Sequence, residues 1–275
     1  MTAGTRAVKY ALLTAAALLL VGAPVWLVLV NAAKPFAEAR TPDFSLPEQW
    51  ALADNFHTVL TEGRAGTGLL NSLLITGSSV AFILVAGSMA AWIFARSASR
   101  TVRAVFYAAI VGILVPAPVI TSVYLDAQLG LQGSRLSLIG LYAGVYLSLA
   151  IFLITGFVRT IPRELEEAAH LDGAGRQRVF WTIVFPLLGP VLFAAGIVLW
   201  VYLWNDFFYA FFLLGGEDKQ TLPLGLFAVV SSNSHSTNWN YVFADVIVVS
   251  LPLVLVFVLG QRRILAGVMA GGIKG

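Results

Sequence analysis

The segment Trp204-Asn205-Asp206-Phe207-Phe208-Tyr209 places a carboxylate and a carboxamide inside a long apolar interval of the chain. A charged Asp at bilayer depth costs about 2.5–3.5 kcal/mol on insertion scales, so Asp206 must face protein or water. Three roles remain open for Asp206: lining a translocation path, bonding this helix to a partner subunit, or relaying protons. Asn205, Phe208 and Tyr209 are candidates for the same path, although aromatic side chains also fill interfaces.

Other chemistry is excluded by the residues that the chain lacks. It has no cysteine, so it can form neither a disulfide nor a thiolate metal site, and its three histidines are scattered. A P-loop needs Gly before its Lys, but the four lysines follow Val8, Ala33, Asp218 and Ile273. We therefore expect no catalytic residue, no metal and no cofactor in this chain. If ATP drives it, another polypeptide hydrolyses the nucleotide.

Charged residues gather in one compact stretch, residues 160–187. Pro162 followed by Glu164, Glu166 and Glu167 is typical of a helix start, and Asp172-Gly173 is typical of a helix end with a left-handed glycine. A second helix is predicted from about Arg176 to Phe185, ended by Pro186. The pattern predicts an elbow of two short helices; a solvated loop with helical ends is the plain alternative. Its balanced charge argues against a reader of DNA.

The composition indicates what holds these residues. The chain of 275 residues is 59% hydrophobic and 11% charged, with a mean hydropathy of +0.85. A soluble domain carries about 25% charge, so too few polar groups are present to cover a globule in water. We predict an all-α integral membrane protein with a single domain over residues 1–275.

Six apolar intervals are long enough, or nearly so, to cross about 30 Å of hydrocarbon as helices. The first could be a signal peptide, but its apolar core is long for one, so an uncleaved helix is preferred. Pro116 and Pro118 are expected to bend the third helix. The predicted spans are about 10–31, 68–95, 104–125, 136–158, 188–214 and 241–260, with the elbow at 160–187 and a tail at 261–275.

Basic residues orient the predicted bundle. One side carries Arg6, Lys9, Arg96, Arg100, Arg103, Arg159, Arg163, Arg176, Arg178, Arg262, Arg263 and Lys274, whereas the other carries only Lys34, Arg40, Arg64, Arg135 and Lys219. The positive-inside rule then places both termini, the elbow and the tail in the cytoplasm.

The elbow also carries a spaced pattern: Glu167-Ala168-Ala169, Asp172-Gly173-Ala174, and then Phe180, Ile183, Pro186 and Pro190. This pattern resembles the EAA signature of permease subunits of ABC importers. The resemblance implies a type I importer permease whose elbow is the coupling helix that sits in a cleft of the ATPase subunit. It implies that Glu167 makes the polar contact, that Ala168 and Ala169 permit close approach, and that Asp172-Gly173 makes the turn.

Two further segments resemble the MalG-type, sugar-importing branch of that family. The tail QRRILAGVMAGGIKG implies contact with the ATPase dimer through Gly267, Gly271 and Lys274; a stop-transfer anchor is the plain alternative. The segment Leu222-Pro223-Leu224-Gly225 resembles an outer loop that faces the solute-binding protein; an interfacial helix is its alternative. The N-terminal 60 residues match only in layout.

The resemblance implies the partners and the cargo. The partners are a second homologous permease, an ATPase dimer that holds Mg-ATP, an extracytoplasmic binding protein and the lipid of a prokaryotic cytoplasmic membrane, with no nucleic acid. Relatives carry di- and oligosaccharides, and some carry glycerol phosphates or polyols, so the substrate stays open. A proton-coupled secondary carrier is the competing class, but the inverted repeats typical of such carriers are not apparent.

Overall fold

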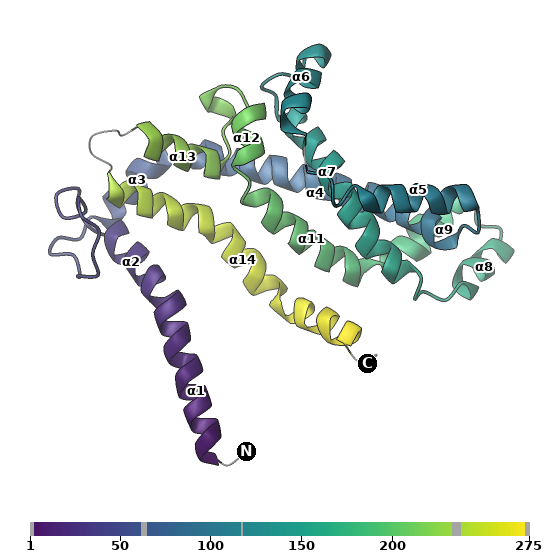
Figure 1. Cartoon of the computed structure of the whole chain (residues 1–275), viewed down its shortest axis with the longest axis horizontal. Coiled ribbons are helices and arrows are strands. Elements are labelled where there is room, and N and C mark those ends of the chain that lie inside the picture. Colours follow the sequence, from purple (N-terminus) through teal and green to yellow (C-terminus); the bar gives the residue numbers. More distant parts are fainter. Residues whose placement is uncertain (1–2, 62–64, 117, 233–237, 273–275) are drawn as a thin grey trace. The chain divides into compact units, whose positions relative to one another are not determined.

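The computed structural model describes residues 3–61, 65–116, 118–232 and 238–272, and within these ranges the protein is helical with no β-strand (Figure 1). Contacts divide it into two compact units, Met1–Leu69 with Leu222–Pro252, and Leu70–Thr221 with Leu253–Gly275. That the chain acts as a single permease domain stays a prediction. The helices are α1 (Ala3–Ala17), η1 (Leu18–Gly22), α2 (Ala23–Ala32), α3 (Leu52–Thr61), α4 (Ala65–Arg96), α5 (Arg100–Val111), α6 (Val119–Leu129), α7 (Arg135–Val158), α8 (Glu164–Leu171), α9 (Arg176–Val179), η2 (Phe180–Val184), α10 (Phe185–Leu187), α11 (Gly189–Trp204), α12 (Phe208–Leu213), η3 (Glu217–Lys219), α13 (Leu222–Ser232) and α14 (Trp239–Gly272).

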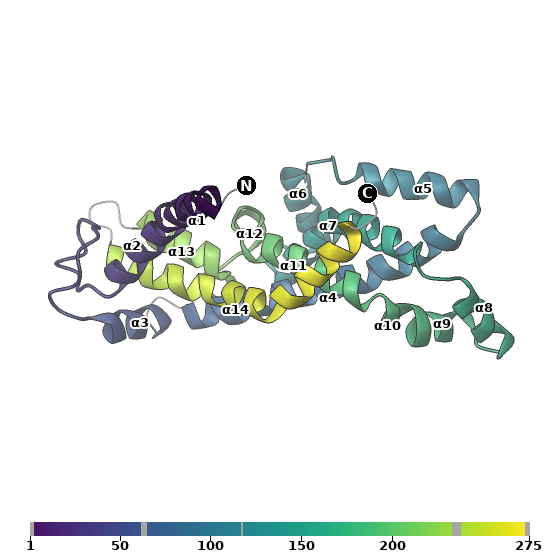
Figure 2. The ribbon, with the colours of Figure 1, turned by 90° about the horizontal axis from the view of Figure 1, so that it is seen from below.

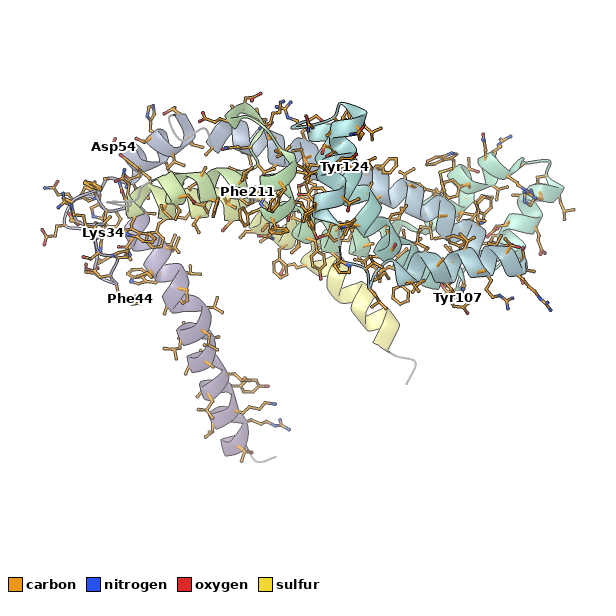
Figure 3. All side chains as sticks on the ribbon, turned by 45° about the horizontal axis from the view of Figure 1, so that its top comes forward. Lys34, Phe44, Asp54, Tyr107, Tyr124 and Phe211 are labelled. Carbon is orange, nitrogen blue, oxygen red and sulfur yellow. The ribbon has the colours of Figure 1, made fainter. Side chains whose placement is uncertain are left out.

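The first unit holds an ordered loop between α2 and α3. The Lys34 side chain is buried and its ammonium lies 2.5 Å from the Asp43 carboxylate; Figure 3 shows Lys34 at the end of α2 and Phe44 in the loop. Asn55 of α3 is also buried and donates hydrogen bonds to the carbonyls of Ala32 and Lys34. Asn240 of α14 donates to the Asn55 side-chain oxygen at 2.9 Å. These polar contacts hold the backbone of the loop, whose carbonyls no helix satisfies.

The charge of Lys34 changes the acidity of its partner. The hydrogen bond from Lys34, helped by those from the Ser45 hydroxyl and backbone, lowers the pKa of Asp43 to about 2. Asp43 is exposed to solvent, so this is a local effect at the surface of the loop.

The second unit is organised around α7, which packs against α5 and α11 (Figure 1). The core between these helices is apolar: Ile154 and Val158 of α7 and Leu199 of α11 are fully buried. The short helix α12 returns to contact α6 and α7. This arrangement fixes the segment between α11 and α12 beside α7.

Four predicted spans are confirmed as long apolar helices: Val8–Ala32, Ala65–Arg96, Arg135–Val158 and Trp239–Val258. A fifth can be formed by the segments Arg176–Leu187 and Gly189–Trp204, which meet at an angle of 72°. The described residues thus provide four to five apolar spans by length and composition.

The predicted third span, 104–125, is not one bent helix. It is divided into α5 and α6, of 12 and 11 residues, which are each too short to cross a bilayer. The helical hydrogen bonding stops after residue 114, and Pro118 precedes α6 as its cap residue with φ −82° and ψ 73°. Two prolines within three residues remove two backbone donors, so the chain breaks where a bend was expected.

One other local prediction is wrong. Pro186 does not end the second elbow helix: it lies in α10 directly after the π-turn η2, and the bend follows at Leu188. The segment Leu222-Pro223-Leu224-Gly225 forms the beginning of α13, and its contact with the binding protein stays a prediction.

Candidate functional site: the α8 elbow and the α11–α12 break

The elbow consists of α8 and the helical run α9–η2–α10, joined at Gly173. Gly173 has a φ of +83°, the left-handed conformation that the sequence predicts for it. The backbone N–H of Ala174 donates to the Ala169 carbonyl, and the His170 ring contacts the Ala174 carbonyl at 2.9 Å. Figures 1 and 2 both place α8 beyond the end of α4 in the second unit. The turn is thus closed by its own bonds.

Neighbouring residues of α8 face opposite environments. Glu167, Ala168 and Asp172 are exposed, and the Glu167 carboxylate has no hydrogen bond or ion pair with the part of the chain that the structure describes. Leu171 is 90% exposed, which is unusual for a large apolar side chain. Glu166 and Ala169 are buried. Ala169 therefore supports the elbow from inside, and the exposed face is formed by Glu167, Ala168 and Leu171.

Glu166 is held by the end of α4. Its Oε1 accepts from Arg96 Nε at 2.8 Å and lies 2.7 Å from Arg96 Nη2, while its Oε2 accepts from Trp92 Nε1 at 2.9 Å. Arg96 Nη2 also donates to the Ile161 carbonyl. The Trp92 ring lies 5.5 Å from the ring of Phe180, which is buried in η2. This clamp joins α4, α8 and η2, and it leaves neither Glu166 oxygen unpaired.

The second candidate region is the break between α11 and α12. Asp206 Oδ2 accepts from the Tyr142 hydroxyl of α7 at 2.7 Å, and both carboxylate oxygens accept from first-turn amides of α12, those of Tyr209 and Ala210. The side-chain amide of Asn205 donates a hydrogen bond to the Val201 carbonyl at 2.8 Å. Asp206 therefore caps α12 and ties it to α7. The hydrogen bonds of Asp206 in this structure are all to this chain, and the three roles that the sequence leaves open for it stay predictions.

Tyrosine rings surround this carboxylate. Tyr142 is fully buried, and its ring lies 6.3 Å from that of Tyr146 and 6.4 Å from that of Tyr209. Tyr146 stacks on Tyr202 of α11 at 5.9 Å. Phe208, at 52% exposure, lies edge-on to Tyr209. The candidate path residues are thus part of an aromatic group that extends from the buried Tyr142 to the surface of the unit.

The other predicted contact residues lie on helices. Leu222 and Leu224 of α13 are buried within the first unit, whereas Pro223 and Gly225 are half-buried. The backbone of the tail is helical through Gly267 and Gly271 as part of α14, and Lys274 lies outside the described residues. Within the described ranges, no group of three or more His, Asp or Glu side chains could hold a metal ion.

Three residues of these sites were missed in the sequence: Arg96, Trp92 and Tyr142. Arg96 was counted only as a basic residue of a loop, and Trp92 and Tyr142 as apolar span residues. Their partners lie 64 to 74 residues away along the chain. Nothing in the local sequence around Glu166 or Arg96 indicates that the two side chains form a bond.

The long apolar helices are typical of a protein embedded in a membrane. Residues 83–269 match the family described as "Binding-protein-dependent transport system inner membrane component". The chain belongs to this family, the permease subunits of ABC importers. As a permease, it is a transport protein and not itself an enzyme.

Individual relatives agree with that assignment, and one solved structure shares the fold. The chain is 34% identical over 225 residues, 80% of each chain, to the melibiose/raffinose/stachyose import permease protein MelC of Bacillus subtilis (strain 168). It is 30% identical over 267 residues, 96% of this chain and 88% of the relative, to the diacetylchitobiose uptake system permease protein NgcG of Streptomyces coelicolor. Its fold matches a bacterial ABC transporter involved in import of the acidic polysaccharide alginate, with a TM-score of 0.83, 21% identity, and coverage of 95% and 98%.

Proposed function

We propose that this chain is the membrane-spanning permease subunit of an ATP-driven, binding-protein-dependent importer of a di- or oligosaccharide. Support comes from the names of the relatives, which import melibiose, raffinose, stachyose or diacetylchitobiose. The named substrates are all saccharides, so a saccharide is preferred to a glycerol phosphate or a polyol.

The proposed topology has six membrane crossings. Four are the long helices, the fifth is formed by α11 and α12 with the break between them, and the sixth consists of α5 and α6 with the break between them. A broken helix is tolerated at membrane depth where neighbouring protein supports it. The distribution of Lys and Arg favours cytoplasmic termini and a cytoplasmic elbow in a prokaryotic cell membrane.

One observation supports the elbow as the coupling element: its exposed face offers an unpaired Glu167 beside a nearly fully exposed Leu171. Burial in a cleft of a protein partner favours the exposed Leu171, and the adjacent Glu167 can accept hydrogen bonds from that partner. The partner is the ATPase, which binds Mg-ATP. Ala168 permits close seating, and the tail with Gly267, Gly271 and Lys274 is the second proposed contact with the ATPase dimer.

The remaining predicted sites take their roles from this assembly. A second, homologous permease completes an alternating-access pathway. Asn205, Asp206, Phe208 and Tyr209 are this chain's proposed contribution to that pathway. Because Leu222 and Leu224 are buried, the proposed contact with the binding protein is made by the half-buried Pro223 and Gly225 at the start of α13.

Reconstitution of the complete importer in proteoliposomes tests the proposal. We expect oligosaccharide uptake that depends on ATP, on the ATPase and on the binding protein. Glu167→Lys and Leu171→Asp should each leave the protein inserted and abolish uptake, whereas Glu164→Lys, at an exposed position of the same helix, should not. Uptake driven by a pH gradient without ATP would refute the proposal in favour of a proton-coupled carrier.

A further inference from the structure

The helix α4 carries a polar clamp at each end. At one end lies the clamp of Arg96, Trp92 and Glu166 described above. At the other end, Asn71 donates to the carbonyls of Asp218 and Gln220 at 2.9 Å and accepts from Arg135 Nε at 3.0 Å. Asn71 is 6% exposed, and all of its side-chain hydrogen-bonding groups but one lone pair are accounted for by these three bonds. Both clamps lie in the second unit.

The distance between the clamps matches the thickness of a membrane. Asn71 and Arg96 are separated by 25 residues of continuous helix, about 38 Å at the rise of an α-helix. A bilayer with its headgroup regions is about 40–45 Å thick. An unbroken helix of this length, crossing a bilayer, is long enough to place one clamp near each of its surfaces.

α4 differs in this respect from the other route out of the elbow. The covalent route runs through α9, η2 and α10, bends by 72° at Leu188 and breaks again at Asn205. A helix with a π-turn, a bend and a break dissipates displacement by changing its angles. α4 has 32 residues without a proline or a break, so a displacement at Arg96 is carried to Asn71.

We propose that α4 is the transmission helix of this permease, with Arg96 and Glu166 as positioning residues that make α8 move α4, and Asn71 as the residue by which α4 moves the segment Asp218–Gln220. The inference rests on the proposed function, in which α8 is moved by the ATPase. Glu167 and Glu166 thereby have different roles: Glu167 faces the ATPase, and Glu166 holds α4, the helix that α8 moves.

Uptake per ATP in the reconstituted importer tests the positioning role. Glu166→Gln keeps an acceptor for Trp92 and removes the charge that holds Arg96; we expect uptake per ATP to fall about tenfold while ATP hydrolysis continues. Glu164→Gln is the matched control. The exchanged pair Arg96→Glu with Glu166→Arg should restore at least part of the coupling. Asn71→Ala should likewise lower uptake per ATP while ATP hydrolysis continues.

A distance measurement provides a readout that simple destabilisation would not move. The chain contains no cysteine, so Leu165→Cys on α8 and Phe82→Cys on α4 give a clean spin-label pair. Arg96 contacts Glu166, the neighbour of Leu165, and Phe82 lies fourteen residues from Arg96, about 21 Å along the helix. A separation of this order is within the range of pulsed electron paramagnetic resonance. Trapping the ATP-bound importer should leave this distance unchanged in the parent protein, and should shift or broaden it with Glu166→Gln.

The outcomes separate the two proposals. If Glu167→Lys abolishes uptake while Glu166→Gln changes neither uptake per ATP nor the label distance, the transmission role is refuted and the proposed function stands. A distance that changes on ATP trapping in the parent protein also refutes it, because α8 and α4 then move independently. If Glu167→Lys has no effect on uptake, the coupling role of α8 in the proposed function is refuted. If Asn71→Ala leaves uptake per ATP unchanged, the proposed role of Asn71 is refuted.

Discussion

The left-handed turn at Gly173 offers a sharp test of how stiff the elbow must be. Gly173 and Gly175 lie two residues apart, and a Cβ added at either would meet no atom within 4 Å. They differ in backbone conformation: φ is +83° at Gly173 and −70° at Gly175. Substitution of each by Ala therefore changes the same number of atoms in equally open surroundings, and only the variant at Gly173 is strained.

The expected magnitude follows from that difference. An L-residue in the left-handed region costs about 1–2 kcal/mol, which reduces the population of the turn by about 5- to 30-fold if nothing else compensates. Gly173→Val should cost more, because a β-branched side chain is worse in this region. Gly173→Asn should cost less, since Asn enters this region more readily. Gly175→Ala should be close to neutral.

The assay is ATP-dependent uptake by the reconstituted importer, with membrane yield as the control for insertion. We expect uptake to fall in the order Gly175→Ala, Gly173→Asn, Gly173→Ala, Gly173→Val, at similar yields. Equal activity of the two Ala variants would refute the reasoning, because it would show that the turn geometry does not limit coupling. Equal loss in both would point to space rather than backbone strain, again against the argument.

Three other predictions concern the polar contacts. Asn55→Ala removes two buried hydrogen bonds to carbonyls and one from Asn240, and each group left unsatisfied costs about 1–3 kcal/mol, so the thermal unfolding midpoint should fall. The control Asp54→Glu, at the exposed neighbouring position (Figure 3), should not change the midpoint. An unchanged midpoint for Asn55→Ala would contradict the role of Asn55 in holding the loop. Because the pKa of Asp43 is lowered from 3.8 to about 2, its contribution to the stability of the loop is fully present above pH about 4 and is lost as the pH falls toward 2. Hydrogen exchange of residues 33–51 should therefore accelerate as the pH falls over that range. Asp43→Asn should remove this pH-dependent step. Tyr142→Phe deletes one hydrogen bond to a carboxylate, which is worth about 1.5–3 kcal/mol, so it should lower the melting temperature of the purified complex. The control Tyr107→Phe, at an exposed tyrosine (Figure 3), should have no effect. Equal melting temperatures of the two variants would show that the bond between Tyr142 and Asp206 contributes nothing.

The prolines show where local sequence rules were sufficient and where they failed. Two prolines at 116 and 118 end α5 and delay α6 until residue 119, because each removes a donor that the helix needs. Pro186, a single proline directly after the π-turn η2, leaves the helix running to Leu187. The position of a proline relative to the turn that contains it decides between these outcomes.

The sequence by itself determined the membrane class, four of the long spans, the elbow with its left-handed glycine and the resemblance to importer permeases. These follow from composition, length and local backbone preference, which are properties of contiguous residues. Only the tertiary structure decided that Glu166 faces inward and Glu167 outward, that Tyr142 holds Asp206, and that Asn71 and Arg96 clamp the two ends of α4. Each of these depends on which helix faces lie together, and contacts between residues some 64 to 149 positions apart leave no pattern in the local sequence.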